Sequence, residues 1–184
     1  MMKKFTLSMA ALLLTAVVLF AQDPQVPDFK NTPMILKKDG SLAKLEKQTS
    51  EIKHKAKAMG YGGTSTYLNF TDGASPVRLS TDAVFIIKVA DAETDPETVF
   101  YVTKVIPHNK TREVDLVNIS AFAGYGAGGK STKKDQIKVE YEKISPGVYR
   151  VMPKDLARNT EYAFIPVAAS TTGGNSVVFL FGTL

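Results

Sequence analysis

The sequence predicts a mostly β domain, and this prediction rests on the chain downstream of Ala83. Short segments there place apolar residues at every second position, which is the spacing of a strand that buries one face. Breaks rich in proline, glycine and asparagine separate these segments. Several short strands in succession favour an antiparallel sandwich or barrel over alternating β and α units.

Seven strands are expected in this part of the chain. In the fourth, Ile137, Val139 and Tyr141 share one side, while lysine and glutamate occupy the other. The first is instead a nearly continuous apolar run. The expected strands span residues 83–90, 98–106, 112–122, 136–143, 147–152, 161–168 and 176–181.

The first part of the domain leaves two alternatives open. The dipeptide Asp39-Gly40 divides residues 34–45 and favours a tight hairpin turn in which both central residues have positive φ. Residues 42–59 place apolar side chains at intervals of three and four, which suits an amphipathic helix, yet Ile52 to Ala58 also alternates with lysines. Strands are favoured here and across residues 64–70. An N-terminal helix lying on the sheet is the alternative.

The chain begins like an exported protein. Lys3 and Lys4 precede an almost wholly apolar run that ends at Ala21, which is the order of a cleavable signal peptide. The run has about 14 residues, whereas a membrane-spanning helix needs roughly 20. We expect a signal peptide at residues 1–21, an extended, proline-containing lead-in at 22–33 and a single domain at 34–184. The mature protein would have no transmembrane segment and would lie in the periplasm, at the cell surface or outside the cell.

Composition excludes several classes of protein. The chain has no cysteine, which rules out a lipid-anchored lipoprotein, disulfides and thiolate metal sites. Loss of the two lysines of the signal lowers the formal net charge from +5 to +3. So small a charge does not predict a nucleic-acid partner. The domain must therefore be stabilised by its apolar core.

One local pattern bears on the topology. Leu156, Thr160, Tyr162 and Phe164 form L-x-x-x-T-x-Y-x-F at the entry to an expected strand. This pattern resembles the tyrosine corner of fibronectin type III and immunoglobulin-like sandwiches, although those domains usually have proline where this chain has Arg158. The resemblance implies an immunoglobulin-like antiparallel β-sandwich in which the buried Tyr162 hydroxyl bonds the backbone near Leu156. More broadly, the signal pattern, the opening hairpin and the C-terminal strand ending in Phe179, Phe181 and Gly182 resemble those of small exported bacterial proteins of a family with no assigned function.

A glycine-rich stretch imitates a phosphate-binding loop. Residues 124–131, GYGAGGKS, satisfy the expression G-x-x-x-x-G-K-[ST]. A genuine loop of this kind opens a helix, whose first amides hold the phosphates. Here Thr132 to Gln136 is short and polar, and an expected strand follows. We therefore interpret the stretch as a flexible glycine loop between two strands and expect no nucleotide to bind.

Alternating carboxylates are a second chemical candidate. Asp91, Glu93, Asp95 and Glu97 offer the oxygen ligands that Ca²⁺ prefers, but the glycine at the sixth position of an EF-hand loop is absent. A solvated acidic loop is the favoured interpretation, and a calcium site is the alternative. His108 lies in an expected turn and has no recognisable catalytic partner in the sequence.

Candidate binding residues lie in and after two glycine-rich stretches. Tyr61 and Tyr125 are flanked by glycines, where strand packing does not readily explain an aromatic ring. Exposed aromatic residues often anchor partners. Three lysines follow the second tyrosine closely, namely Lys130, Lys133 and Lys134.

Two classes of function follow. The favoured one is a non-catalytic envelope or secreted module that has no cofactor and binds an envelope protein or glycan through the tyrosines and lysines just named. The alternative is a hydrolase that acts on envelope material through the acids of residues 91–97 and His108.

The mature protein should begin near Gln22, because the charged start, the apolar run and Ala21 together form a cleavage pattern. Intact-mass measurement of the exported protein checks this expectation. A mass that still includes residues 1–21 would contradict it.

Overall fold

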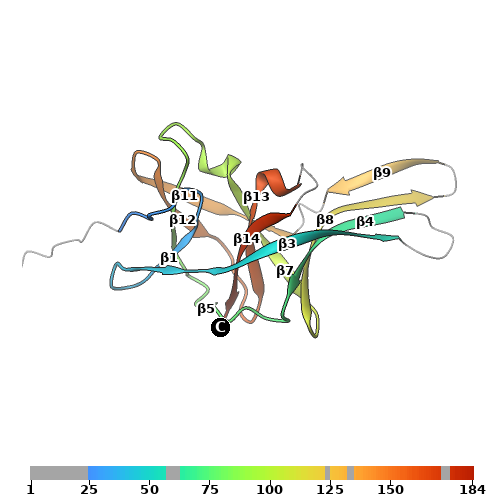
Figure 1. Cartoon of the computed structure of the whole chain (residues 1–184), viewed down its shortest axis with the longest axis horizontal. Helices are drawn as coiled ribbons and strands as arrows, with labels where there is room; N and C mark the ends of the chain where they lie inside the picture. The colour runs from blue at the N-terminus through green and yellow to red at the C-terminus, as the bar shows by residue number, and fades with distance from the viewer. Residues whose placement is uncertain (1–24, 57–62, 123–124, 132–134, 171–174) are drawn as a thin grey trace, which may run out of the picture.

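The computed structural model describes residues 25–56, 63–122, 125–131, 135–170 and 175–184, so the expected signal peptide lies outside the described residues. The described chain is all-β, which confirms the predicted class (Figure 1). Its strands are β1 (Met34–Leu36), β2 (Leu42–Lys44), β3 (Glu46–Ala56), β4 (Gly63–Thr71), β5 (Arg78–Leu79), β6 (Phe85–Lys88), β7 (Phe100–Pro107), β8 (Thr111–Phe122), β9 (Tyr125–Ser131), β10 (Gln136–Ile137), β11 (Val139–Ser145), β12 (Val148–Pro153), β13 (Glu161–Pro166) and β14 (Ser176–Thr183). Two short 3-10 helices, η1 (Pro96–Thr98) and η3 (Val167–Ser170), complete the described elements.

The larger sheet closes into a six-stranded barrel. Its strands follow the order β10-β7-β13-β14-β3-β4-β8-β9. β7 also pairs with β8, Ile106 with Glu113 and Pro107 with Arg112, so that β7, β13, β14, β3, β4 and β8 form a ring. The far halves of β3, β4 and β8 continue with β9 as a projecting arm (Figure 1).

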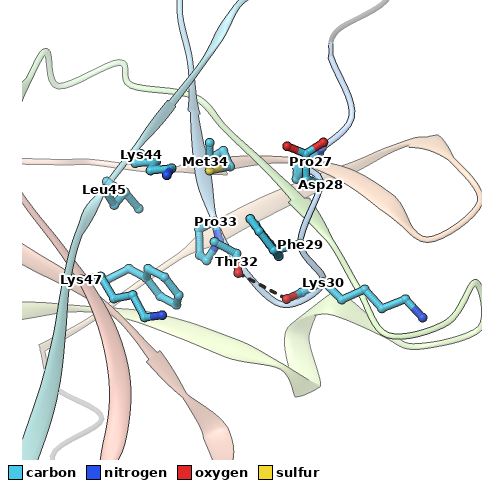
Figure 2. Close-up of a pocket in the computed structure, with 11 residues that line it drawn as sticks. Pro27, Asp28, Phe29, Lys30, Thr32, Pro33, Met34, Lys44, Leu45 and Lys47 are labelled. Carbon is cyan, nitrogen blue, oxygen red and sulfur yellow. Dashed lines mark hydrogen bonds between the residues drawn. The ribbon is translucent and has the colours of Figure 1, made fainter.

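The second sheet has five antiparallel strands in the order β11-β12-β6-β1-β2. The chain passes directly between this sheet and the barrel at two corners. Only Leu45 separates β2 from β3, and the ribbon runs on through Lys44 and Lys47 (Figure 2). Only Lys138 separates β10 from β11. Packed sheets commonly form corners through strands that switch sheets in this way.

The wall made of β13, β14 and the first half of β7 (residues 100–103) is largely buried on both faces. On β13, Tyr162 and Phe164 point to the five-stranded sheet, whereas Ala163 and Ile165 point into the barrel. Neighbouring residues of a strand face opposite sides, so one strand serves two cores. The protein therefore has two apolar cores that share this wall.

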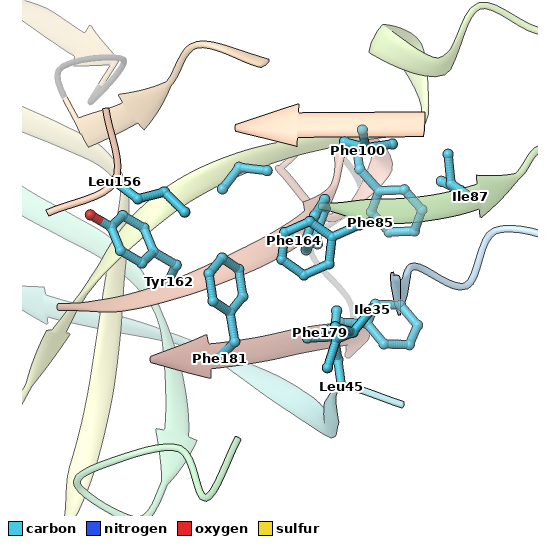
Figure 3. Close-up of a cluster of buried hydrophobic side chains, with 12 residues drawn as sticks. Ile35, Leu45, Phe85, Ile87, Phe100, Leu156, Tyr162, Phe164, Phe179 and Phe181 are labelled. Carbon is cyan, nitrogen blue, oxygen red and sulfur yellow. The ribbon is translucent and has the colours of Figure 1, made fainter. Parts of the chain in front are cut away.

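Aromatic rings fill the core between the two sheets (Figure 3). Phe85 of β6 contacts Phe164 edge-on, with ring centroids 5.0 Å apart, and lies 5.1 Å from the ring of Phe181. Tyr162 stacks on Phe181 at 5.5 Å. Such pairs contribute stability beyond the area they bury, so these contacts fasten the second sheet to the shared wall.

The barrel core is mainly aliphatic and ends in charged residues. On β8, Val114 and Leu116 share the barrel-facing row with Arg112, which is 0 % exposed. The Arg112 guanidinium donates to both carboxylate oxygens of Glu46, at 3.0 and 2.6 Å, and to the carbonyls of Thr71 and Asp72. Burial of an arginine requires this degree of hydrogen bonding, because an unpaired charge in the interior is very costly.

A second ion pair extends this cluster. Arg78 pairs with Glu161, the first residue of β13, and Arg112 lies 3.6 Å from the same carboxylate. The Glu161 carboxylate also accepts the Ser75 N–H at 2.9 Å. Gly182 leaves the necessary space, because a Cβ there would overlap the Arg78 guanidinium. These charges close one end of the barrel.

The pKa of Glu46 is lowered in this cluster. Burial, the largest single influence, raises it, but hydrogen bonds from Arg112, Ser75 and Gln48 together with the charge of Arg112 outweigh burial. Glu46 is therefore held as a carboxylate in the folded protein.

The crossover before β13 has the geometry that the sequence predicts around Tyr162. Its ring is buried, and its hydroxyl accepts the N–H of Ala157 at 2.8 Å, next to the buried Leu156. Thr183 of β14 donates to the Ala157 carbonyl at 2.5 Å. The crossover is thus tied to both strands that follow it.

Several predictions about local structure require comment. Residues 42–44 and 46–56 are strands, which confirms the favoured alternative up to Ala56 and excludes a helix there. The hairpin is present, but only Gly40 has positive φ, 81°, because the turn closes from Lys37 to Gly40 and not at Asp39-Gly40 alone. The closed barrel leaves the immunoglobulin-like sandwich unconfirmed.

The glycine-loop prediction is wrong for Tyr125–Ser131. These residues form β9, which pairs with β8 from Val117 to Phe122. Glycines are unfavourable within a strand, and here the ladder with β8 overrides that preference. A strand in place of a loop that opens a helix does not supply phosphate-binding amides.

Tyr162→Phe should lower the free energy of unfolding by about 1 to 3 kcal/mol, because the Ala157 N–H loses its acceptor. Tyr162→Ala should cost roughly 3 to 5 kcal/mol, because it also empties a ring-sized space. Chemical denaturation measures both, with Tyr149→Phe on the half-exposed β12 position as a near-neutral control. Equal, negligible losses for the two Tyr162 variants would contradict this geometry.

Acid should weaken the barrel end through Glu46. Since its folded pKa lies below the ordinary value of 4.5, its contribution to stability is present above that pH and is lost as the pH falls through the folded value. Glu46→Gln should cost about 3 to 5 kcal/mol at neutral pH, the range for a broken buried ion pair.

Denaturation curves between neutral pH and pH about 3 check this expectation, because the difference between wild type and Glu46→Gln should shrink on acidification. Glu51→Gln, an exposed change on the same strand, should leave stability nearly unchanged. A difference for Glu46→Gln that is constant with pH would contradict the assignment.

Candidate functional site

The apolar strip on the outer face of the shared wall extends beyond the second sheet. Along β14, exposure rises from 0 % at Phe181 to 6 % at Phe179 and 38 % at Val177, three residues that share one face. Val167, directly after β13, is also exposed. The aromatic core is therefore open at this end.

A hollow of about 390 Å³ lies at this opening, between the lead-in and the Leu45 corner (Figure 2). Phe29, Met34, Leu45 and Phe179 provide its apolar lining. Leu45 and Phe179 belong to the aromatic core, so the hollow reaches into that core (Figure 3). Phe29 is 67 % exposed, which is unusual for so large an apolar side chain.

Two further hollows adjoin the first. One, of about 720 Å³, shares Thr32, Lys47 and Phe179 with it and reaches Val177. The other, of about 390 Å³, shares Pro27, Asp28 and Met34 with it, and reaches Val26 and Leu42. We call the three hollows together the corner groove.

The lead-in forms one wall of the corner groove. Pro27 and Pro33 are buried, and the N–H of Asn31 donates to the Lys88 carbonyl at 2.6 Å. Asn31 has a φ of 52°, a conformation that asparagine tolerates better than most residues. These contacts hold residues 27–33 in place while the Phe29 ring faces outward.

Positive charge surrounds the groove. Lys30, Lys44 and Lys47 line the first hollow, and Asp28 is the only acidic residue among its described lining residues. Among the described residues, no acidic group lies within 4.0 Å of any of these three ammonium groups. The groove thus combines an apolar floor with an uncompensated basic rim.

Two of the four acids in the acidic loop cap turns. Asp91 accepts the N–H of Glu93 at 3.1 Å, and Asp95 accepts the N–H of Glu97 at 2.9 Å at the start of η1. All four side chains are exposed. No group of three or more His, Asp or Glu side chains in the described parts of the chain is placed to hold a metal ion. The alternation in sequence therefore does not produce a convergent ligand set.

Tyr141 of β11 lies near this loop. Burial, and then the charges of Glu97 and Asp95, raise the pKa of the Tyr141 phenol to about 12. The phenol consequently stays neutral at physiological pH. Glu97 and Asp95 thus affect Tyr141 through their negative charge, which disfavours a second negative charge on its phenol.

His108 does not meet the acidic loop. The loop precedes β7 and His108 follows it, and a strand of eight residues spans roughly 25 Å at about 3.3 Å per residue. His108, in the turn between β7 and β8, instead lies 3.2 Å from the Glu113 carboxylate of β8. The two parts of the hydrolase alternative thus lie at opposite ends of one strand.

The structure describes the side chains of none of the tyrosine and lysine candidates. Tyr61, Lys133 and Lys134 lie outside the described residues. Tyr125 and Lys130 lie on β9, and only their backbone is described. The corner groove was missed in the sequence, although a lone phenylalanine in a proline-containing lead-in was a signal.

Comparison with known proteins identifies no relative. No protein-family model matches the chain, and no curated protein or solved structure matches it significantly. Within the described residues, no helix is long and apolar enough to cross a membrane.

Proposed function

We propose that this chain is an exported, non-catalytic envelope or secreted module that binds a partner protein through the corner groove. The observation behind this proposal is the apolar strip of the shared wall, which continues out of the core to Val177 and meets the exposed Phe29. Contiguous exposed apolar surface with a polar rim is typical of interaction sites.

A protein partner is favoured over a glycan. The floor made of Phe29, Met34, Leu45 and Phe179 offers no side-chain hydrogen-bonding group. Sugar hydroxyls facing that floor could replace their hydrogen bonds to water only at the polar rim, so burying them there is costly. Apolar side chains of a protein would instead gain free energy on burial.

A hydrolase is the less favoured proposal. Its acids and His108 lie at opposite ends of β7, and Asp91 and Asp95 are engaged as caps. Both proposals assume that the protein is exported, which we infer from the signal pattern at residues 1–21. We also propose that the crossover around Tyr162 is related to the tyrosine corner of immunoglobulin-like sandwiches.

Substitutions in the groove should abolish capture of the partner. The full chain, expressed with its own export signal and a C-terminal affinity tag, would be incubated with envelope extract. Phe29→Glu and Val177→Glu each place a charge on an exposed apolar position of the groove. Loss of a central apolar anchor costs about 2 kcal/mol or more, roughly a thirtyfold loss of affinity.

Ile106→Glu is the matched control, because Ile106 is an exposed apolar residue near the far end of β7. A protein captured by the wild type and by this control, but by neither groove variant, would support the proposal. Equal capture by all four proteins, or none by the wild type, would contradict it.

A further inference from the structure

We propose that the occupant of the corner groove is an extended segment of the partner protein in which acidic residues alternate with bulky apolar ones. This inference rests on the proposed function and specifies the chemistry of the partner. It is drawn from the charge, the shape and the lining of the groove.

The charge of the groove calls for an anionic occupant. Lys30, Lys44 and Lys47 are exposed and lack acidic partners among the described residues, while Asp28 is the single acid in the first hollow. Complementary charge speeds association and excludes partners of the wrong sign. Flexible lysine side chains suit carboxylates presented at several points along a segment.

The shape of the groove calls for an extended occupant. Each of the two outer hollows shares three lining residues with the first hollow, so the three are contiguous. Together they run from Val26 and Leu42 past Phe29 to Val177. A compact small molecule would fill one hollow, whereas an extended chain advances about 3.3 Å per residue and can visit all three.

The lining explains why acidic and apolar residues should alternate. The apolar floor and the lysine rim lie side by side, since Leu45 is flanked in sequence by Lys44 and lies two residues before Lys47. Successive side chains of an extended peptide point to opposite sides. One set would enter the floor while the other meets the rim.

Fluorescence anisotropy with labelled peptides tests this inference on the full exported chain. The probe is a peptide of about ten residues that alternates glutamate with leucine, and its matched controls replace glutamate by glutamine or by lysine. The glutamate peptide should bind saturably, at least tenfold more tightly than the glutamine peptide, and the lysine peptide should not bind. Salt raised from about 0.05 to about 0.5 M should weaken the glutamate peptide selectively.

Charge reversal locates the effect. The double variant Lys44→Glu with Lys47→Glu should lose at least tenfold in affinity for the glutamate peptide. Lys104→Glu with Lys110→Glu changes the same number of exposed lysines on β7 and the turn that follows it, and it should leave binding unchanged. Circular dichroism of both variants verifies that they fold.

The other outcomes separate this inference from the proposed function. Equal binding of the glutamate and glutamine peptides, lost in Phe29→Glu, would overturn the acidic specificity while the groove remains a binding site. If the groove captures a protein from extract but binds none of the peptides, the proposed peptide segment is not the occupant. Saturable binding of palmitate without peptide binding would lead to the same conclusion. Failure of both peptide binding and capture would overturn the proposed function itself.

Discussion

Burial of β13 and β14 on both faces is the constraint on which the rest of this structure depends. Tyr162 and Phe164 need a covering layer on one side, and Ala163 and Ile165 need one on the other. The barrel closes around the smaller side chains, and the five-stranded sheet covers the aromatic ones. The corners at Leu45 and Lys138 follow, because each lets a single stretch of chain contribute to both layers.

The same constraint creates the groove. The apolar row of β14 continues from the buried Phe179 to the exposed Val177, where the lead-in and residues 94–99 border the hollows. At the other end of the barrel, Arg112 and its carboxylate partners occupy the last inward-facing positions of their strands. Their hydrogen-bonded charges close that end. One end of the molecule is therefore sealed by ion pairs, while the aromatic core opens towards a basic groove.

Period-two patterns in the sequence were sufficient to predict most strands downstream of Ala83, the Asp39-Gly40 dipeptide predicted the opening hairpin, and the resemblance to a tyrosine corner implied the bond of the Tyr162 hydroxyl. They were insufficient for the barrel, because alternation assigns side chains to faces but does not say which strands pair. Closure depends on two residue pairs between β7 and β8. The ion pair of Arg112 with Glu46 joins residues far apart in the chain, although an arginine in the same row as Val114 and Leu116 was a visible signal. β9 was missed because pairing with β8 overrides the preference of its glycines.

The central claim is that the uncovered end of the shared wall is where this protein binds its partner. Hydrogen–deuterium exchange of the full exported chain, with and without the captured partner, tests it most directly. The account predicts slower amide exchange in residues 28–34, 44–45, 47 and 176–179, which include the groove lining, with little change in residues 75–78 and 111–113 of the charged cluster. Protection confined to the projecting arm, formed by the far halves of β3, β4 and β8 with β9, and absent from the groove would contradict it.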